Sequence, residues 1–159
     1  MKLRSISCDD WAEILLIQDE CYPDLEPESL QALQSKWRVS PLSCFVIEIH
    51  KQVVGYCLAH PWHLGNPPSL EQVITADKQA NSLYLHDIAL SAKAQGKGAG
   101  QAALKKLMQL AKQSAYSSLS LVAVQGASSY WMKQGFVVQE IEKSLTGYTP
   151  DACYMVLEI

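Results

Sequence analysis

The chain has 159 residues, of which 48% are hydrophobic and 18% are charged, so it can bury a core of its own and is not intrinsically disordered. This length predicts a single domain over residues 1–159, and the net charge of −3 gives no reason to expect a nucleic-acid partner. The sequence has no bilayer-spanning apolar run, no signal-peptide pattern and five scattered cysteines without a CxxC pair, which predicts a cytoplasmic protein with reduced thiols and no membrane partner.

The first half of the chain predicts a strand, two helices and a hairpin, followed by a long loop. The strand covers residues 2–7, the first helix covers residues 9–18, and the second helix begins at Pro27 with Leu30, Leu33 and Trp37 on one face. Residues 44–50 and 53–60 are two β-prone runs separated by two residues, which is typical of a tight hairpin. Residues 61–82 form the long loop, with one short helical turn expected at 70–74, and a loop of this length is usually functional.

The second half predicts four strands and two helices. The strands cover residues 83–90, 119–124, 136–141 and 152–157, and the helices cover residues 98–114 and 127–133. In the first of these helices Leu104, Leu107, Met108 and Ala111 recur with helical spacing, which indicates a buried face. Residues 119–124 are a continuous apolar run, as expected of a strand that is covered on both sides. The order of elements predicts an α/β fold.

Charge is distributed unevenly along the chain. Residues 8–28 contain eight acidic and no basic residues, whereas residues 88–139 contain six lysines and no acidic residue. The second stretch is therefore expected to face an anion and the first a cation. The alternative is that the acidic residues only cap helices and the lysines only coat a solvated helix.

A glycine-rich loop joins the strand at 83–90 to the helix at 98–114. Gly96, Gly98 and Gly100 at the start of a helix let the backbone approach a ligand, and the N–H groups there bind phosphate oxygens. The dinucleotide fingerprint does not fit, because seven residues separate Leu90 from Gly98 and no acidic residue ends the next strand. A P-loop does not fit either, because Gln101 follows Gly100. A helix start without a ligand remains the alternative.

Two segments resemble the signatures of the GCN5-related N-acetyltransferases (GNAT). Residues 95–100 (QGKGAG) are similar to the family's Q/R-x-x-G-x-G/A motif, residues 88–90 (IAL) stand at its L-A-V strand end, and residues 127–136 (ASSYWMKQGF) resemble its A-x-x-F-Y-x-x-x-G-F signature. The resemblance implies a central mixed, mostly antiparallel sheet that is flanked by helices and splayed at an acetyl-CoA site. The cofactor-binding residues that it implies are Ile88, Ala89, Leu90, Gln95, Gly96, Lys97, Gly98, Ala99, Gly100, Gln125 and Trp131.

Acetyl transfer to an amine needs a general base, since only the neutral amine attacks a thioester. His86 is the candidate because imidazole titrates near neutral pH, and strand alternation is expected to place Tyr84, His86 and Ile88 on one face and Leu85, Asp87 and Ala89 on the other. Tyr84 and His86 also resemble the H-x-H pair of arylalkylamine acetyltransferases, with Tyr84 in place of the first histidine, so both are candidate catalytic residues. A core role for His86 remains open, and Asp87 is expected to be structural.

The resemblance also shows one departure from the family pattern. Trp131 stands where the family usually has the tyrosine that protonates the leaving thiolate, so solvent, Tyr148 or Tyr154 would have to supply that proton. His60 and His63 suggest no metal site, because no further ligand has suitable spacing.

The features together predict an acetyl-CoA-dependent N-acetyltransferase acting on an amine, in the first place a small cationic amine, with a protein amine left open. The acceptor is expected at the acidic loop of residues 19–26, bordered by residues 61–82; the candidate acceptor-binding residues are Asp19, Glu20, Tyr22 and Asp24. A non-catalytic acyl-CoA-binding sensor is the alternative function. The chain could be a monomer or a homodimer.

Overall fold

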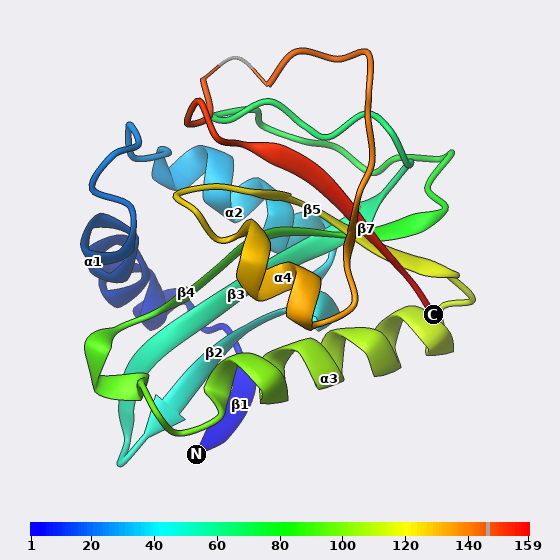
Figure 1. Ribbon diagram of the computed structural model, residues 1–159. Helices are drawn as coiled ribbons and strands as arrows, with labels where there is room; N and C mark the ends of the chain where they lie inside the picture. The colour runs from blue at the N-terminus through cyan, green and yellow to red at the C-terminus, as the bar shows by residue number, and fades with distance from the viewer. Residues whose placement is uncertain (146) are drawn as a thin grey trace.

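In the computed structural model, which describes residues 1–145 and 147–159, seven strands form one sheet in the order β1-β2-β3-β4-β5-β7-β6 (Figure 1). The strands are β1 (Lys2–Ser5), β2 (Cys44–Ile49), β3 (Gln52–Trp62), β4 (Ser82–Leu90), β5 (Ser118–Ala123), β6 (Val137–Val138) and β7 (Cys153–Glu158). The helices are α1 (Trp11–Cys21), α2 (Leu30–Val39), α3 (Ala99–Gln113) and α4 (Ser128–Lys133). All neighbouring strands are antiparallel except β4 and β5, which confirms the predicted mixed, mostly antiparallel sheet.

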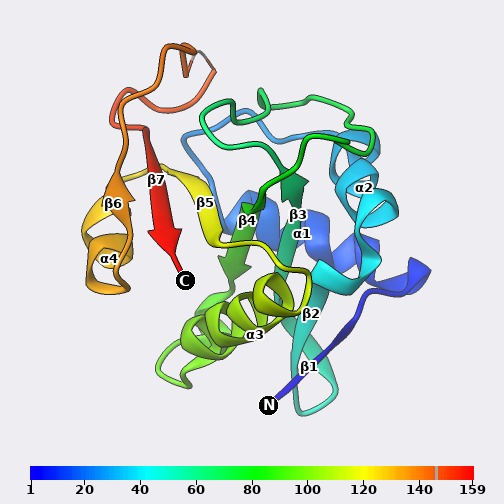
Figure 2. The ribbon, with the colours of Figure 1, turned by 90° about the vertical axis from the view of Figure 1, so that its right-hand side faces the viewer.

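Two hydrophobic clusters cover the two faces of the sheet. Helices α1 and α2 lie on one side of the sheet and α3 on the other, as the edge-on view in Figure 2 shows. The cluster under α1 and α2 includes Trp11, Ile14, Leu33, Val46 and Tyr56. The cluster under α3 and α4 includes Phe45, Leu85, Leu104, Leu107 and Trp131, so the apolar face predicted for residues 98–114 is the buried face of α3.

Several boundaries differ from the sequence-based expectation, and each difference has a local cause. Helix α2 begins at Leu30 rather than at Pro27, because the Ser29 hydroxyl accepts the Ala32 N–H at 3.1 Å and caps the helix there. The tight hairpin between β2 and β3 is confirmed, but its turn residues are His50 and Lys51, one residue earlier than residues 51 and 52, and both have positive φ. Residues 70–74 form a turn without a helix, and β6 is shorter than the strand predicted at 136–141.

A β-bulge interrupts the pairing of β3 with β4. Leu58 pairs with Asp87 and Ala59 pairs with Leu85, so His86 is an extra residue in β4 that has no partner in the register. An extra residue breaks the two-residue alternation of a strand, so the extra residue and the one that follows it can point to the same face. The predicted alternation along β4 therefore holds from Tyr84 to His86 and is wrong from Asp87 onward.

Strands β4 and β5 separate soon after they pair. Only three register pairs join them, and the last is Leu85 with Leu121, although β4 continues to Leu90 and β5 to Ala123. The ends of the two strands leave a V-shaped opening in the middle of the sheet, as the resemblance implied.

The buried face of α3 generates a test of the core. Leu107 is fully buried, so replacing it with Ala should lower the free energy of unfolding by about 2–5 kcal/mol through lost burial and a residual cavity. Leu16 on α1 is 60% exposed, and its replacement with Ala should change that free energy by less than about 0.5 kcal/mol. Urea unfolding followed by circular dichroism measures both, and equal losses in the two variants would contradict this core assignment.

Candidate functional site

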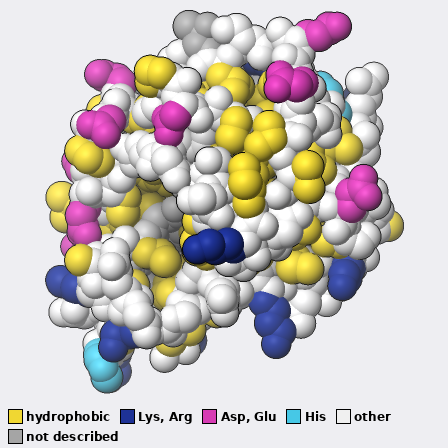
Figure 3. All heavy atoms as spheres, viewed as in Figure 1, with side chains coloured by type: hydrophobic (Ala, Val, Ile, Leu, Met, Phe, Trp, Pro, Cys, Tyr) yellow, Lys and Arg dark blue, Asp and Glu magenta, His cyan; other side chains and the backbone are white. Residues whose placement is uncertain are grey.

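A cavity of about 320 Å³ occupies the opening between β4 and β5. Its walls come from the loop between α1 and α2 (Tyr22, Glu28), from the separated strands (Ile88, Val122) and from the start of α4 (Tyr130, Trp131). Figure 3 shows hydrophobic side chains inside a hollow on this face, with Lys and Arg side chains mostly in the lower half of the view and Asp and Glu side chains in the upper half, on the left and on the right.

The glycine loop lies at the outer end of the cavity, before α3. Gly96 and Gly98 have φ of 73° and 72°, and a Cβ added to either would meet nothing within 4 Å, so both the backbone conformation and the open surroundings suit glycine. Gly98 is the N-cap of α3, whose first-turn N–H groups have no intrahelical acceptor. Lys97 is exposed beside them. Backbone N–H groups and one nearby cation are suited to hold a diphosphate.

Tyr130 and Gln125 meet the cavity near the same end. A Cβ on Gly100 would lie 2.9 Å from the Tyr130 hydroxyl, so this close approach depends on glycine. The side-chain N–H of Gln125 donates to the Cys21 carbonyl at 3.0 Å, and its Oε1 is buried with no hydrogen-bond partner among the described residues. Trp131 also lines the cavity, but most of its ring is packed in the core against Phe136.

The inner end of the cavity holds a buried hydrogen-bonded pair, His86 and Glu28. His86 Nε2 lies 2.7 Å from Glu28 Oε2, and their side chains are only 1% and 8% exposed. Burial alone would raise the pKa of the Glu28 carboxyl, but the His86 imidazole and the Glu71 N–H outweigh it and lower that pKa to about 2. An ionised carboxylate is therefore fixed 2.7 Å from the ring of the predicted base.

Asp87 lies on the same face of β4 as His86, contrary to the predicted alternation. Its carboxyl accepts the hydroxyls of Tyr22, at 2.5 Å, and of Tyr56, and both tyrosines approach from the side of α1. The bulge at His86 is the physical reason, since it turns both residues toward the α1 and α2 side. Burial raises the pKa of Asp87 to about 6. Ile88, which was expected to share a face with His86, instead packs with the α3 side of the core.

Among the residues predicted to bind the acceptor, Tyr22 lines the cavity. The carboxylate of Glu20 instead accepts the Ala92 N–H at 2.8 Å, which fastens the end of α1 to the turn before the glycine loop. Asp19 and Asp24 are exposed and lie off the cavity wall. The predicted catalytic residue Tyr84 is buried beside His60 and Tyr148 and does not line the cavity.

Two loops meet over the α2 end of the cavity and form a roof. Lys143 Nζ donates to the Pro67 carbonyl at 2.6 Å, and the Tyr148 hydroxyl donates to the Pro68 carbonyl at 3.0 Å. These bonds join the loop between β6 and β7 to the long loop between β3 and β4, and the two loops lie side by side at the top of Figures 1 and 2. Leu70 of the long loop and Tyr148 line the cavity beneath this roof.

Sequence reasoning missed Glu28 and Glu26 as individual residues of the site. Both belong to the acidic stretch of residues 8–28, but nothing in their spacing distinguishes them from the six other acidic residues there. Within the described residues, no cluster of three or more His, Cys, Asp or Glu side chains could hold a metal ion. No helix of that part of the chain is long and apolar enough to cross a membrane.

The chain was compared with known proteins and solved structures. A comparison with curated proteins gives no match. Among solved structures, the loading GNATL domain of CurA from Lyngbya majuscula is 14% identical over 99% of this chain and 96% of its own, with a TM-score of 0.79. The GphF GNAT-like decarboxylase in complex with isobutyryl-CoA is 14% identical over 99% of both chains, with a TM-score of 0.78. A ribosomal-protein-alanine N-acetyltransferase from Brucella melitensis is 18% identical over 100% of both chains, with a TM-score of 0.70.

At such identities the solved structures show a shared fold alone. The family model is more specific, because the description "Acetyltransferase (GNAT) family" matches residues 11–136, which is more than half of the chain. The glycine loop, the separated strands β4 and β5 and the helix α4 all lie within that match. The chain therefore belongs to the acetyltransferase (GNAT) family.

Proposed function

We propose that the protein is an N-acetyltransferase that moves the acetyl group of acetyl-CoA directly to a small cationic amine, with His86 as the general base. The observation that carries the proposal is the cavity itself, which is lined by Gly100 of the glycine loop at one end and by the buried imidazole–carboxylate pair at the other. An acetyl transfer from coenzyme A needs one group that holds the cofactor and another that takes the proton of the amine, and this cavity has a candidate for each.

The cofactor end supports acetyl-CoA as co-substrate. Coenzyme A carries several negative charges, and five of the six lysines between residues 88 and 139 are exposed, while no acidic residue opposes them in that stretch. Among the structural neighbours, one was crystallised with isobutyryl-CoA and an N-acetylglutamate synthase from Neisseria gonorrhoeae with coenzyme A. The unpaired edges of β4 and β5 offer backbone groups to a pantetheine arm.

The inner end supports base-assisted chemistry. An amine with an ordinary pKa near 10.4 is neutral in only about one molecule in 2,500 at pH 7, which corresponds to roughly 4.6 kcal/mol. A base at the site removes that proton either directly or through one water. His86 is one of the residues that line the cavity, although its side chain is only 1% exposed. His60 does not line the cavity, and burial lowers the pKa of His60 to about 3.

The residues that line the cavity are consistent with a small cationic acceptor. The roof formed by Lys143 and Tyr148 closes one side, and about 320 Å³ must hold both the thioester end of the co-substrate and the acceptor amine. Glu28 and Glu26 supply negative charge to this space, and Tyr22, Leu25 and Leu70 supply apolar wall. An ammonium group on a compact apolar body matches these surroundings.

The competing function is a sensor that binds acyl-CoA without catalysis. It is favoured by Trp131 at the usual position of the proton-donating tyrosine, and by Tyr148, whose hydroxyl already donates to Pro68. Acceptor-dependent release of the coenzyme A thiol, measured over a panel of amines, separates the two functions. Release with any amine excludes the sensor, and tight coenzyme A binding without release from any amine excludes the enzyme.

The glycine loop generates a test of cofactor binding. Gly98→Asp places a side chain and a negative charge against the expected diphosphate, so coenzyme A affinity should fall by more than about tenfold in calorimetry. Gly65→Asp is a matched control, since Gly65 has a similar φ of 83° and equally open surroundings away from the loop. Unchanged affinity in Gly98→Asp, or an equal loss in Gly65→Asp, would place the diphosphate elsewhere.

The role of His86 generates a test by pH. His86→Ala should lower kcat by roughly 10²–10⁴-fold at pH 7 while leaving coenzyme A affinity unchanged. Activity should recover in part as the pH rises, because the neutral amine then becomes abundant without a base. Near-normal turnover at pH 7 in a folded His86→Ala variant would show that His86 is a core histidine and not the base.

The acidic rim generates a test of acceptor recognition. Glu26 lines the cavity, so Glu26→Gln should raise KM for a cationic acceptor about two- to fivefold and weaken the salt dependence of kcat/KM. The double variant Asp19→Asn with Asp24→Asn acts from outside the cavity, and its smaller effect should vanish at high salt. If neither variant changes KM or its salt dependence, the acidic residues are solvated helix caps and the acceptor is not recognised by charge at this rim.

A further inference from the structure

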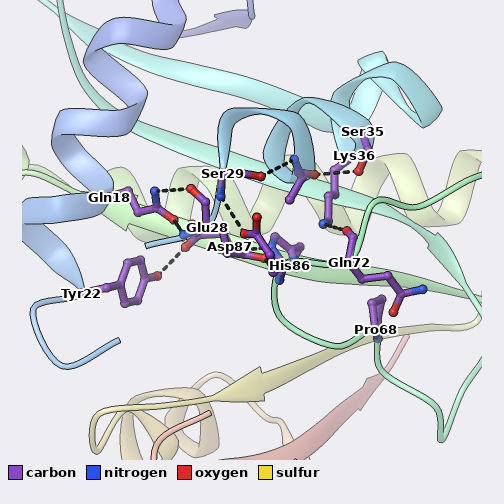
Figure 4. A network of polar contacts seen from close by, with 12 residues as sticks. Gln18, Tyr22, Glu28, Ser29, Ser35, Lys36, Pro68, Gln72, His86 and Asp87 are labelled. Carbon is purple, nitrogen blue, oxygen red and sulfur yellow. Dashed lines mark hydrogen bonds and ion pairs between the residues drawn. The ribbon is translucent and has the colours of Figure 1, made fainter. Parts of the chain in front are cut away.

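Glu28 is buried and is hydrogen-bonded through both its backbone and its side chain, unlike an acidic helix cap in solvent. Its backbone N–H donates to Gln18 Oε1 at 3.0 Å, and its carbonyl accepts from Gln18 Nε2 at 3.2 Å. One carboxylate oxygen accepts the Glu71 N–H at 2.9 Å, and the other lies on His86 Nε2 at 2.7 Å (Figure 4). Glu28 therefore holds a hydrogen-bond-accepting oxygen from the loop before α2 in a fixed position against the His86 ring on β4, 58 residues away in the sequence.

The chemistry of this contact assigns the proton on the imidazole. A carboxylate with a pKa near 2 is ionised and only accepts hydrogen bonds, so Nε2 must carry a hydrogen. In the neutral ring the lone pair is then on Nδ1. Nδ1 is buried and has no hydrogen-bond partner among the described residues.

We propose that Glu28 is the positioning residue of His86, and that it leaves Nδ1 as the nitrogen that takes the acceptor's proton, directly or through one water. This inference rests on the proposed function. The ammonium group of the acceptor first loses one proton to Nδ1, which passes it to solvent. The neutral amine nitrogen then forms a bond to the acetyl carbon and the C–S bond breaks, while the second amine proton goes to Nδ1 and from there to the coenzyme A thiolate. The Glu28 charge stabilises the imidazolium while it lasts.

The other charged and titratable groups around His86 do not share this role. They are Lys36 of α2, His60 of β3, Tyr84 and Asp87 of β4, Glu71 of the long loop, and Tyr148. The Lys36 ammonium is directed to the Gln72 carbonyl, and Asp87 is occupied by two tyrosine hydroxyls. His60 Nδ1 faces the Pro61 carbonyl, which only accepts, so His60 is the opposite tautomer from the one expected for His86.

The alternative role for Glu28 is mechanical. Its bond to the Glu71 N–H joins the loop before α2 to the long loop, and this bond could hold the wall together without any effect on His86. A test must therefore use a readout that depends on the charge next to His86 and not only on the stability of the wall. Glu71→Gln is the matched control, because the Glu71 carboxylate accepts the Ser29 N–H at the same junction but does not touch His86.

The first arm of the experiment is kinetic. Glu28→Gln keeps an oxygen that accepts the Nε2–H but removes the charge, so kcat should fall roughly 10–10²-fold with little change in KM for acetyl-CoA. The acid limb of the kcat/KM profile should move to lower pH, because a positively charged imidazolium is no longer stabilised. In a His86→Ala background the same substitution should cost nothing further, and Glu71→Gln should leave rate and profile unchanged. An equal loss with and without His86, or an unshifted acid limb, would overturn the positioning role.

The second arm needs no activity. Nitrogen-15 NMR of the histidine rings in the unaltered protein should show the Nε2–H tautomer for the signal that disappears in His86→Ala, and the Nδ1–H tautomer for His60 as an internal reference. An Nδ1–H tautomer at His86 would overturn the inference even if Glu28→Gln does not fold. If the unaltered protein binds coenzyme A but releases no thiol with any amine, the proposed enzymatic function fails, whereas an active enzyme indifferent to Glu28→Gln fails only the role of Glu28.

Discussion

The separation of β4 from β5 is the constraint on which the rest of the site depends. Two parallel strands that share three register pairs and then diverge leave backbone groups of both without a strand partner, and such groups must be satisfied in another way. The end of α1 does part of this, because the Cys21 thiol donates to the Leu90 carbonyl, and the Tyr22 hydroxyl, which donates to Asp87, lies 3.0 Å from the Ile88 carbonyl. The separated strands and these contacts from one face of the sheet surround the cavity.

The bulge in β4 places two ionisable residues, His86 and Asp87, at that opening. One extra residue in the strand turns His86 and Asp87 to the same face of the sheet, where their side chains have different hydrogen-bond partners. His86 meets an ionised carboxylate, whereas Asp87 meets two neutral phenols. The pKa values of the two buried carboxyls therefore differ. At Glu28 burial alone would raise the pKa, but the His86 imidazole and the Glu71 N–H outweigh burial and lower the pKa to about 2, whereas at Asp87 burial outweighs the His86 imidazole and the two tyrosine hydroxyls and raises the pKa to about 6.

The proposed cofactor end and the proposed acceptor end of the cavity are built on different principles. The glycine loop uses backbone conformation, which depends on a few residues close together in the chain. The acceptor end is assembled from the loop before α2, the long loop and the loop between β6 and β7, which are joined by the bonds of Glu28, Lys143 and Tyr148. Distant solved structures share the fold at 13–18% identity, and the loops that close the acceptor end are where proteins of one fold are free to differ.

The sequence by itself determined the features that depend on near neighbours in the chain. The hairpin turn, the apolar stripe of α3 and the glycines before it all follow from residues within a few positions of one another, so the order of elements and the glycine loop were predictable. The turn itself lies at His50 and Lys51, one residue before the two residues expected from the sequence. The face that Asp87 occupies was not predictable, because alternation assumes an unbroken strand and the bulge arises only from pairing with β3. The partner of His86 was not predictable either, since Glu28 is one of eight similar acidic residues, and only the packing of α1 and α2 against β4 brings that one carboxylate to the ring. Long-range pairing and packing, which no local pattern encodes, decided the chemistry at the inner end of the cavity.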